Sequence, residues 1–170
     1  MAIKRAIVIF PQFDSDTNLI QDIRNQYDPL ANKILPHITL VFPFTSEISS
    51  DVLRQHIKNS LQGFKAFSLS MQGISHESGN YLVLNLIKGY AEIIKIHDLL
   101  YSGILTRFLS NKHIYQPHLT VGRFKNSSAA KTAMNQLKSF DYKFKTKVNK
   151  ITTEIILDDL CSKIDFETTL

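Results

Sequence analysis

The alternation of hydrophobic and polar positions predicts a chain of mixed strands and helices. Short apolar or alternating runs predict strands at 4–10, 37–42, 64–74, 81–87, 118–124, 144–157 and 163–170. Apolar residues that recur every three to four positions predict helices at 16–27, 51–61, 90–108 and within 126–140. Ser15 or Asp16 is the expected cap of the first helix, and a serine is expected to cap the second. Residues 75–80 are predicted to form a hairpin loop.

Two similar pentapeptides divide the chain, PHITL at 36–40 and PHLTV at 117–121. They lie close to half a chain length apart, and each has a similar order of helix and strands around it. The sequence therefore predicts an internal structural repeat within one bilobal domain, residues 1–170. The expected fold is α+β, with a pseudo-two-fold duplication and two mostly antiparallel sheets, flanked by helices, around a central cleft.

Each pentapeptide carries a histidine and a threonine two positions apart. Residues i and i+2 of a strand share a face, so His37 is expected to project with Thr39, and His118 with Thr120. The residues between and after them are apolar and are expected to enter the core. If a two-fold axis relates the lobes, both pairs face the same cleft.

Two histidines across a cleft are suited to acid–base chemistry, because histidine titrates near neutral pH. One ring can remove a proton while the other supplies one, which accelerates a reaction by roughly 10²–10⁴-fold per transfer. Threonine hydroxyls beside them can donate hydrogen bonds to phosphoryl oxygens in the transition state. The pattern indicates in-line cleavage of a phosphodiester without a metal or other cofactor.

The stretches ILPHITLVFPF and YQPHLTVGRF resemble the two signature motifs of the 2H phosphoesterase superfamily, the 2′-5′ RNA ligase-like proteins. The opening of the chain, from RAIVIFP to the first motif, also resembles bacterial members of that group, so the likeness covers almost the whole chain. It implies a bilobal fold and action on 2′,3′-cyclic phosphates, 2′-5′ linkages or related nucleotide esters. By resemblance, His37 and His118 would be acid and base, and Thr39 and Thr120 would bind phosphate.

Two further residues are candidates for substrate binding. Arg123 stands where the family often has a basic residue, shortly after the second motif. Strand parity places it opposite His118, where it would pair or snorkel on the far side, unless Gly122 allows a bulge that turns it back. Tyr115, just before the second motif, could stack on a base or bind phosphate, or it could be a loop aromatic that caps the core.

The leading functional hypothesis is a metal-independent phosphodiesterase that acts on a nucleotide or RNA end. RNA ligation, hydrolysis of cyclic oligonucleotide signals, and a non-catalytic nucleotide-binding module are the alternatives. The near-symmetry of the motifs leaves either histidine free to be the base.

Composition and charge indicate the kind of partner and the cellular location. A formal net charge of +5 favours an anionic partner such as a nucleotide or RNA. The single cysteine, Cys161, and an N-terminus without a signal-peptide pattern predict a cytoplasmic protein, with neither a membrane nor an obligate protein partner implied. Lys143, Lys145 and Lys147 alternate with less polar residues, which indicates a lysine-protected sheet edge, or alternatively a basic stripe for a polyanion.

The other histidines are expected to be structural. His56 and His97 lie on predicted helices beside apolar residues, where they are expected to find hydrogen-bond partners at the core boundary. His76 also precedes a hydroxyl by two positions, but it is predicted to lie in the hairpin loop rather than in a strand. His113 is expected in a loop from which it could reach the cleft.

Overall fold

A computed structural model of the chain describes residues 1–14, 18–77, 79–110, 112 and 114–170. The strands are β1 (Ile3–Ile9), β2 (Ile38–Ser46), β3 (Phe67–Glu77), β4 (Tyr81–Lys88), β5 (His118–Arg123), β6 (Lys143–Val148), β7 (Lys150–Ile156) and β8 (Ser162–Thr169). The helices are α1 (Asn18–Tyr27), α2 (Ser50–Ser60), α3 (Tyr90–Leu100), the 3₁₀ helix η1 (Gly103–Phe108) and α4 (Ser127–Gln136). The fold is α+β, as expected.

The strands form one eight-stranded sheet in the order β6-β3-β4-β5-β2-β1-β7-β8, and all neighbours are antiparallel. The expectation of two sheets is therefore wrong. The sheet nevertheless has two halves that are weakly joined at the centre, where β2 and β5 share a single residue pair, Ile38 with Leu119. Read outward from this junction, each half of the sheet contains four strands, β5-β4-β3-β6 on one side and β2-β1-β7-β8 on the other.

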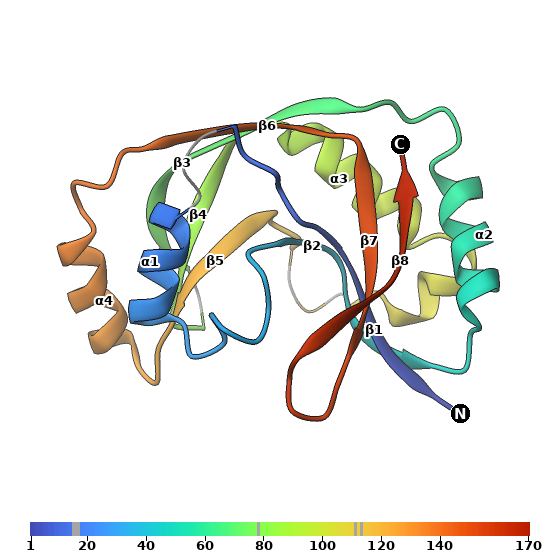
Figure 1. Ribbon diagram of the computed structural model, residues 1–170, viewed down its shortest axis with the longest axis horizontal. Helices are drawn as coiled ribbons and strands as arrows, with labels where there is room; N and C mark the ends of the chain where they lie inside the picture. The colour runs from blue at the N-terminus through green and yellow to red at the C-terminus, as the bar shows by residue number, and fades with distance from the viewer. Residues whose placement is uncertain (15–17, 78, 111, 113) are drawn as a thin grey trace.

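The helices divide between the two halves of the sheet. Helix α1 packs on β5 and α4 on β3 and β4, whereas α3 packs on β2 and α2 on β8. Figure 1 shows α1 and α4 together at one end of the molecule and α2 and α3 at the other, with β2 and β5 between them. One contiguous cluster of buried apolar residues joins the helices to the sheet. The structure thus places both histidine motifs at the middle of the sheet.

Two elements differ from the sequence prediction near the C-terminus and in the third helix. The expected strand 144–157 is two strands, because β6 pairs with β3 at one sheet edge while β7 lies between β1 and β8 in the other half. The expected helix 90–108 ends at Leu100 and continues after a break as the 3₁₀ helix η1, which begins at Gly103 with a φ of 52°.

The helix caps follow the sequence closely. Ser49 caps α2 by accepting a hydrogen bond from the backbone N–H of Val52, and Asn126 caps α4 by accepting one from Ala129. The proposed caps Ser15 and Asp16, and also His113, lie outside the described residues. Among the helices that the structure describes, none is long and apolar enough to span a membrane.

Candidate active site

The two His-x-Thr motifs meet at the junction of the two halves of the sheet. Ile38 and Leu119 are Cα partners across β2 and β5, and both are fully buried in the core. The residues that flank them therefore project together from the opposite face of the sheet. These are His37 and Thr39 from the first motif, and His118 and Thr120 from the second; all four are half-buried. The structure thus brings the four predicted site residues together.

The two histidines are held in the same way. The Nδ1 atom of His37 lies 2.8 Å from the carbonyl oxygen of Leu35, and Nδ1 of His118 lies 2.8 Å from that of Gln116. A carbonyl oxygen can only accept, so Nδ1 carries the proton and donates in each case. In the neutral ring, Nε2 is then the unprotonated nitrogen. Each histidine is oriented as a base through Nε2 or, when charged, as an acid through the same atom.

The prolines of the motifs explain this shared geometry. Leu35 precedes Pro36, and Gln116 precedes Pro117, so both accepting carbonyl groups belong to residues that proline restricts to extended conformations. A fixed, extended residue two positions before the histidine presents its carbonyl oxygen to the imidazole ring. The pattern Pro-His-x-Thr therefore sets the tautomer of the histidine as well as its place in the strand.

Arg123 lies on the same face as the second motif. Val83 pairs with Thr120, and Leu82 pairs with Gly122. One step along β4 therefore spans two steps along β5, and Val121 is the extra residue of a bulge. Tyr81 then pairs with Arg123, and Tyr81 and Val83 share a face. Of the two alternatives that the sequence left open, the bulge that turns Arg123 back is confirmed.

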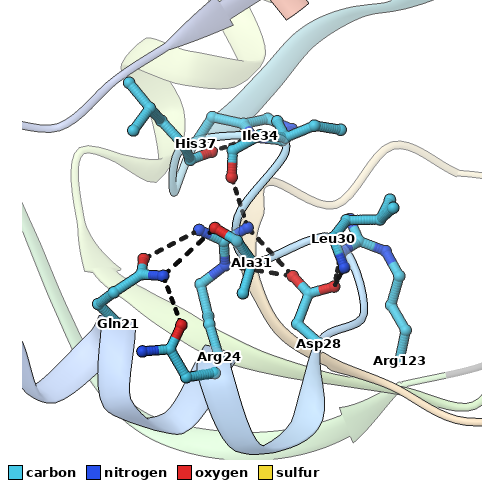
Figure 2. A network of polar contacts seen from close by, with 10 residues as sticks. Gln21, Arg24, Asp28, Leu30, Ala31, Ile34, His37 and Arg123 are labelled. Atoms are coloured by element: carbon cyan, nitrogen blue, oxygen red, sulfur yellow. Dashed lines mark hydrogen bonds and ion pairs between the residues drawn. The ribbon is translucent and has the colours of Figure 1, made fainter. Parts of the chain in front are cut away.

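A buried ionic network connects Arg123 to the first motif (Figure 2). Asp28, just after α1, accepts from Arg123, from the guanidinium of Arg24 at 3.2 Å and from the backbone N–H of Leu30 at 3.0 Å. Arg24 also donates to the carbonyl oxygen of Ile34 at 2.7 Å, three residues before His37. The side chains of Arg24 and Asp28 are 2% and 0% exposed. The network therefore fixes the loop that delivers His37 against the strand that carries Arg123.

Burial lowers the pKa of both candidate catalytic histidines. For His37, burial has the largest effect; the hydrogen bond to the Leu35 carbonyl and the charge of Glu154 oppose it, and Arg123 and Arg24 add to it. For His118, burial is again largest, the Gln116 hydrogen bond and Glu77 oppose it, and Arg123 adds to it. Both rings are consequently neutral near pH 7. An anionic phosphate beside them would favour the charged form of either ring.

One carboxylate thus acts on each histidine, from the third strand outward in its half of the sheet. Glu154 of β7 pairs with Ala6 of β1 and is 3% exposed; its Oε2 atom has no hydrogen-bond partner among the described residues. Glu77 of β3 pairs with Tyr81 of β4 and accepts a hydrogen bond from Ser75 at 3.2 Å. These acids place a negative charge near the site without a direct bond to either imidazole ring.

Tyr115 packs beside the first motif. Its hydroxyl donates to the backbone carbonyl oxygen of Thr39, and its ring stacks on His97 with centroids 3.7 Å apart. Burial raises the pKa of this phenol, so it stays a hydrogen-bond donor. The ring also contacts Phe42 edge-on. The geometry matches the second alternative for Tyr115, a loop aromatic that caps the core, and it also supports the strand that carries Thr39.

The remaining histidines are distributed as follows. His97 donates through Nδ1 to the carbonyl oxygen of Leu40, 2.8 Å away, and His56 donates through Nε2 to that of Leu100, 3.0 Å away, as expected for histidines at a core boundary. The prediction for His76 is wrong in one respect, because β3 extends through it to Glu77. His76 pairs with Leu82, whereas its neighbour Ser75 pairs with Val83 on the face of Thr120. It therefore points away from the site.

Four charged residues near the site were not singled out from the sequence: Arg24, Asp28, Glu77 and Glu154. Arg24 offered a signal, because it follows Ile20 by four positions and therefore lies on the apolar face of its helix. Glu154 was the one charged residue within the run ITTEII, residues 151–156. The other two carried no local signal, since their surroundings depend on distant strands.

Comparison with known proteins agrees with this geometry. The sequence profile of the 2′-5′ RNA ligase superfamily matches residues 11–158. A Bacillus licheniformis protein named "Putative phosphoesterase" is 27% identical over 146 residues, which cover 81% of each chain. A protein of the same name from Bacillus cereus is 25% identical over 156 residues, covering 86% of this chain and 85% of the relative.

Solved structures show the same fold. The crystal structure of E. coli LigT in apo form superimposes with a TM-score of 0.61 at 13% sequence identity and covers 100% of this chain and 98% of its own. The structure of LigT complexed with 3′-AMP gives a TM-score of 0.58 at 13% identity, over 99% and 98% of the two chains. At this level of identity the likeness establishes the architecture.

Proposed function

The chain belongs to the 2′-5′ RNA ligase superfamily, and on that premise we propose that it is a metal-independent phosphodiesterase of nucleotide or RNA ends. Its substrates would be 2′,3′-cyclic phosphates or 2′-5′ linkages. The observation that carries the proposal is the junction of β2 and β5, where two His-Thr pairs project together and each histidine donates through Nδ1 to the carbonyl two residues before it.

The proposed reaction needs one neutral and one charged imidazole. The Nε2 atom of the neutral ring takes a proton from water as the water oxygen bonds to phosphorus. The bond from phosphorus to the 2′- or 3′-oxygen breaks, and the charged ring gives its Nε2 proton to that oxygen. The product is a phosphomonoester, and the two rings have exchanged protonation states. Proton exchange with solvent restores them.

The threonines and Arg123 would hold the phosphoryl group. Thr39 and Thr120 present hydroxyl groups on the same face as the histidines, where they can donate to the non-bridging oxygens as their charge grows. Arg123 stands close enough to both histidines for its charge to lower both pKa values. A cation in that position neutralises part of the charge of a bound phosphodiester.

The test is hydrolysis of 2′,3′-cyclic nucleotides, a 2′-5′-linked dinucleotide and cyclic dinucleotides in the presence of EDTA. We expect turnover by the parent protein that EDTA leaves intact and that His37→Ala and His118→Ala each abolish, while both variants melt like folded proteins. The linkage that is cleaved identifies the substrate class. Equal activity in parent and variants would refute the site, and loss of activity with EDTA would refute the metal-independent mechanism.

A further inference from the structure

A lysine-lined hollow lies at the edge of the sheet, apart from the histidine motifs. It has a volume of about 430 Å³, and the cations that line it are Lys88, Lys143, Lys145 and Lys147. Three of them come from the edge strand β6 and one from the end of β4. We call this feature the lysine groove.

Strand register places these lysines on one face. Ser70 of β3 pairs with Lys88 on one side and with Lys145 on the other, and Ser68 pairs with Lys147. Cross-strand partners project to the same side of a sheet. The lysines therefore surround the hydroxyl-bearing residues Ser68 and Ser70, which also line the groove.

The lysine groove shares its face with the second histidine motif. Met71 and Ile74 are both buried in the core, although they are three residues apart, because β3 contains a bulge between them. Their outer neighbours, Ser70 and Ser75, consequently both project to the opposite face. The Ser75 hydroxyl lies 2.8 Å from the side chain of Asn85, and Asn85 is the Cα partner of His118.

The charge of the lysine groove is unbalanced. All four lysines are exposed, and Asp14 is the acidic residue that lines the hollow with them. Within the described part of the chain, none of the four forms an ion pair. Strand β6 is a sheet edge, so its lysines also guard against edge-to-edge pairing. That role does not account for Lys88, which is on an internal strand and faces the same hollow.

We propose that the lysine groove binds the phosphates of a single-stranded oligonucleotide whose end lies at the paired histidines; this rests on the proposed function. Lys88 is three residues from Asn85 along β4, a span of about 10 Å, and β3 and β6 each add about 4.8 Å across the sheet. The groove would therefore contact phosphates a few nucleotides from the reacting bond. The substrate class is an RNA strand rather than a mononucleotide.

The experiment compares two triple variants with the same net charge. Lys88→Gln/Lys145→Gln/Lys147→Gln removes cations of the lysine groove. The matched control, Lys58→Gln/Lys131→Gln/Lys138→Gln, removes three exposed lysines on or beside α2 and α4. The probe is a fluorescent single-stranded RNA of about ten nucleotides, within the usual range of 4–16 for single-strand sites, with a 3′-phosphate that cannot be cleaved further. Its affinity is measured by anisotropy as a function of salt, alongside turnover of a 2′,3′-cyclic mononucleotide.

We expect the groove variant to reduce the slope of log affinity against log salt by about 2, since each phosphate contact to a single strand contributes about 0.7. Between 50 and 200 mM salt, parent affinity would then fall about 16-fold more than that of the groove variant. The control variant keeps the parent slope, and both variants keep mononucleotide turnover.

The outcomes separate this proposal from the proposed function. Equal salt slopes in the groove and control variants would overturn the lysine groove, even with mononucleotide turnover intact. Lysine-dependent RNA binding without turnover of any substrate would support the lysine groove and refute the phosphodiesterase. Absence of RNA binding by the parent at low salt would also overturn the lysine groove.

Discussion

The two histidine motifs have the same local geometry in different electrostatic surroundings. His37 and His118 make the same hydrogen bond to the carbonyl two residues earlier, at the same 2.8 Å distance. The charge of Arg123 acts on both rings, whereas Arg24 and the buried acid Glu154 act on His37 and Glu77 acts on His118. Local sequence thus sets the orientation of each ring, and distant residues set its charge. The two histidines share their hydrogen-bonding geometry and differ in the charged groups that act on them.

The largest expected effect is the loss of either ring. His37→Ala and His118→Ala should each reduce kcat/KM by at least about 10²–10⁴-fold, because one proton transfer is removed. The double variant should lose little more than either single one, since the two rings act as a unit. Steady-state kinetics on the cleaved substrate measures this. Multiplied losses in the double variant would show that the histidines contribute independently.

The threonines test whether the two halves hold the phosphoryl group equally. Thr39→Val and Thr120→Val keep the side-chain shape but remove a donor, and each should reduce kcat by about 10²–10³-fold. Thr39→Ser and Thr120→Ser are the matched controls and should retain most activity, because they keep the hydroxyl. Should valine and serine variants behave alike, the hydroxyls would have no role in the transition state.

Arg24→Met should reduce the electrostatic difference between the two histidines, one in each half of the sheet. It leaves Asp28 with one buried cation fewer, which should reduce the free energy of unfolding by about 3–5 kcal/mol. It should also raise the pKa of His37, because the charge of Arg24 lowers it, and leave that of His118 in place. Chemical denaturation and NMR titration of the histidine rings measure the two effects. Equal shifts of both rings would contradict the assignment of Arg24 to one half.

The smallest effects should come from the two acids. Glu154→Gln should lower the pKa of His37 further, and Glu77→Gln should lower that of His118, because each carboxylate raises the pKa of the ring in its own half. Each variant serves as the control for the other in the same NMR titration. A shift in the wrong ring, or in both rings equally, would show that these acids do not act separately.

The centre of the site could be predicted from sequence because its signals are local. A period of two residues places each histidine with its threonine, and the repeated motif indicates that the two pairs meet. Arg123 could not be placed, because the bulge at Val121 is visible only in the pairing of β5 with β4. The buried network could not be predicted for the same reason, since Asp28 meets a residue from a strand far along the chain.

The sheet was predicted less accurately than the placement of the two His-x-Thr motifs. The run 144–157 has strand character throughout, and local pattern does not show that its two parts pair in opposite halves of the sheet. The single pair between β2 and β5 likewise depends on tertiary packing. Local sequence indicates that a segment forms a strand, but it does not indicate which strands that segment pairs with.

In the proposed mechanism, one histidine gives a proton while the other takes one. The pH dependence of kcat/KM on a 2′,3′-cyclic nucleotide, measured with EDTA, tests it most directly. Burial lowers both histidine pKa values below the ordinary 6.5, so we expect a bell-shaped profile with its maximum below pH 6.5 and falling activity toward pH 8. A profile that rises to a plateau above pH 7, or one with a single limb, would contradict it.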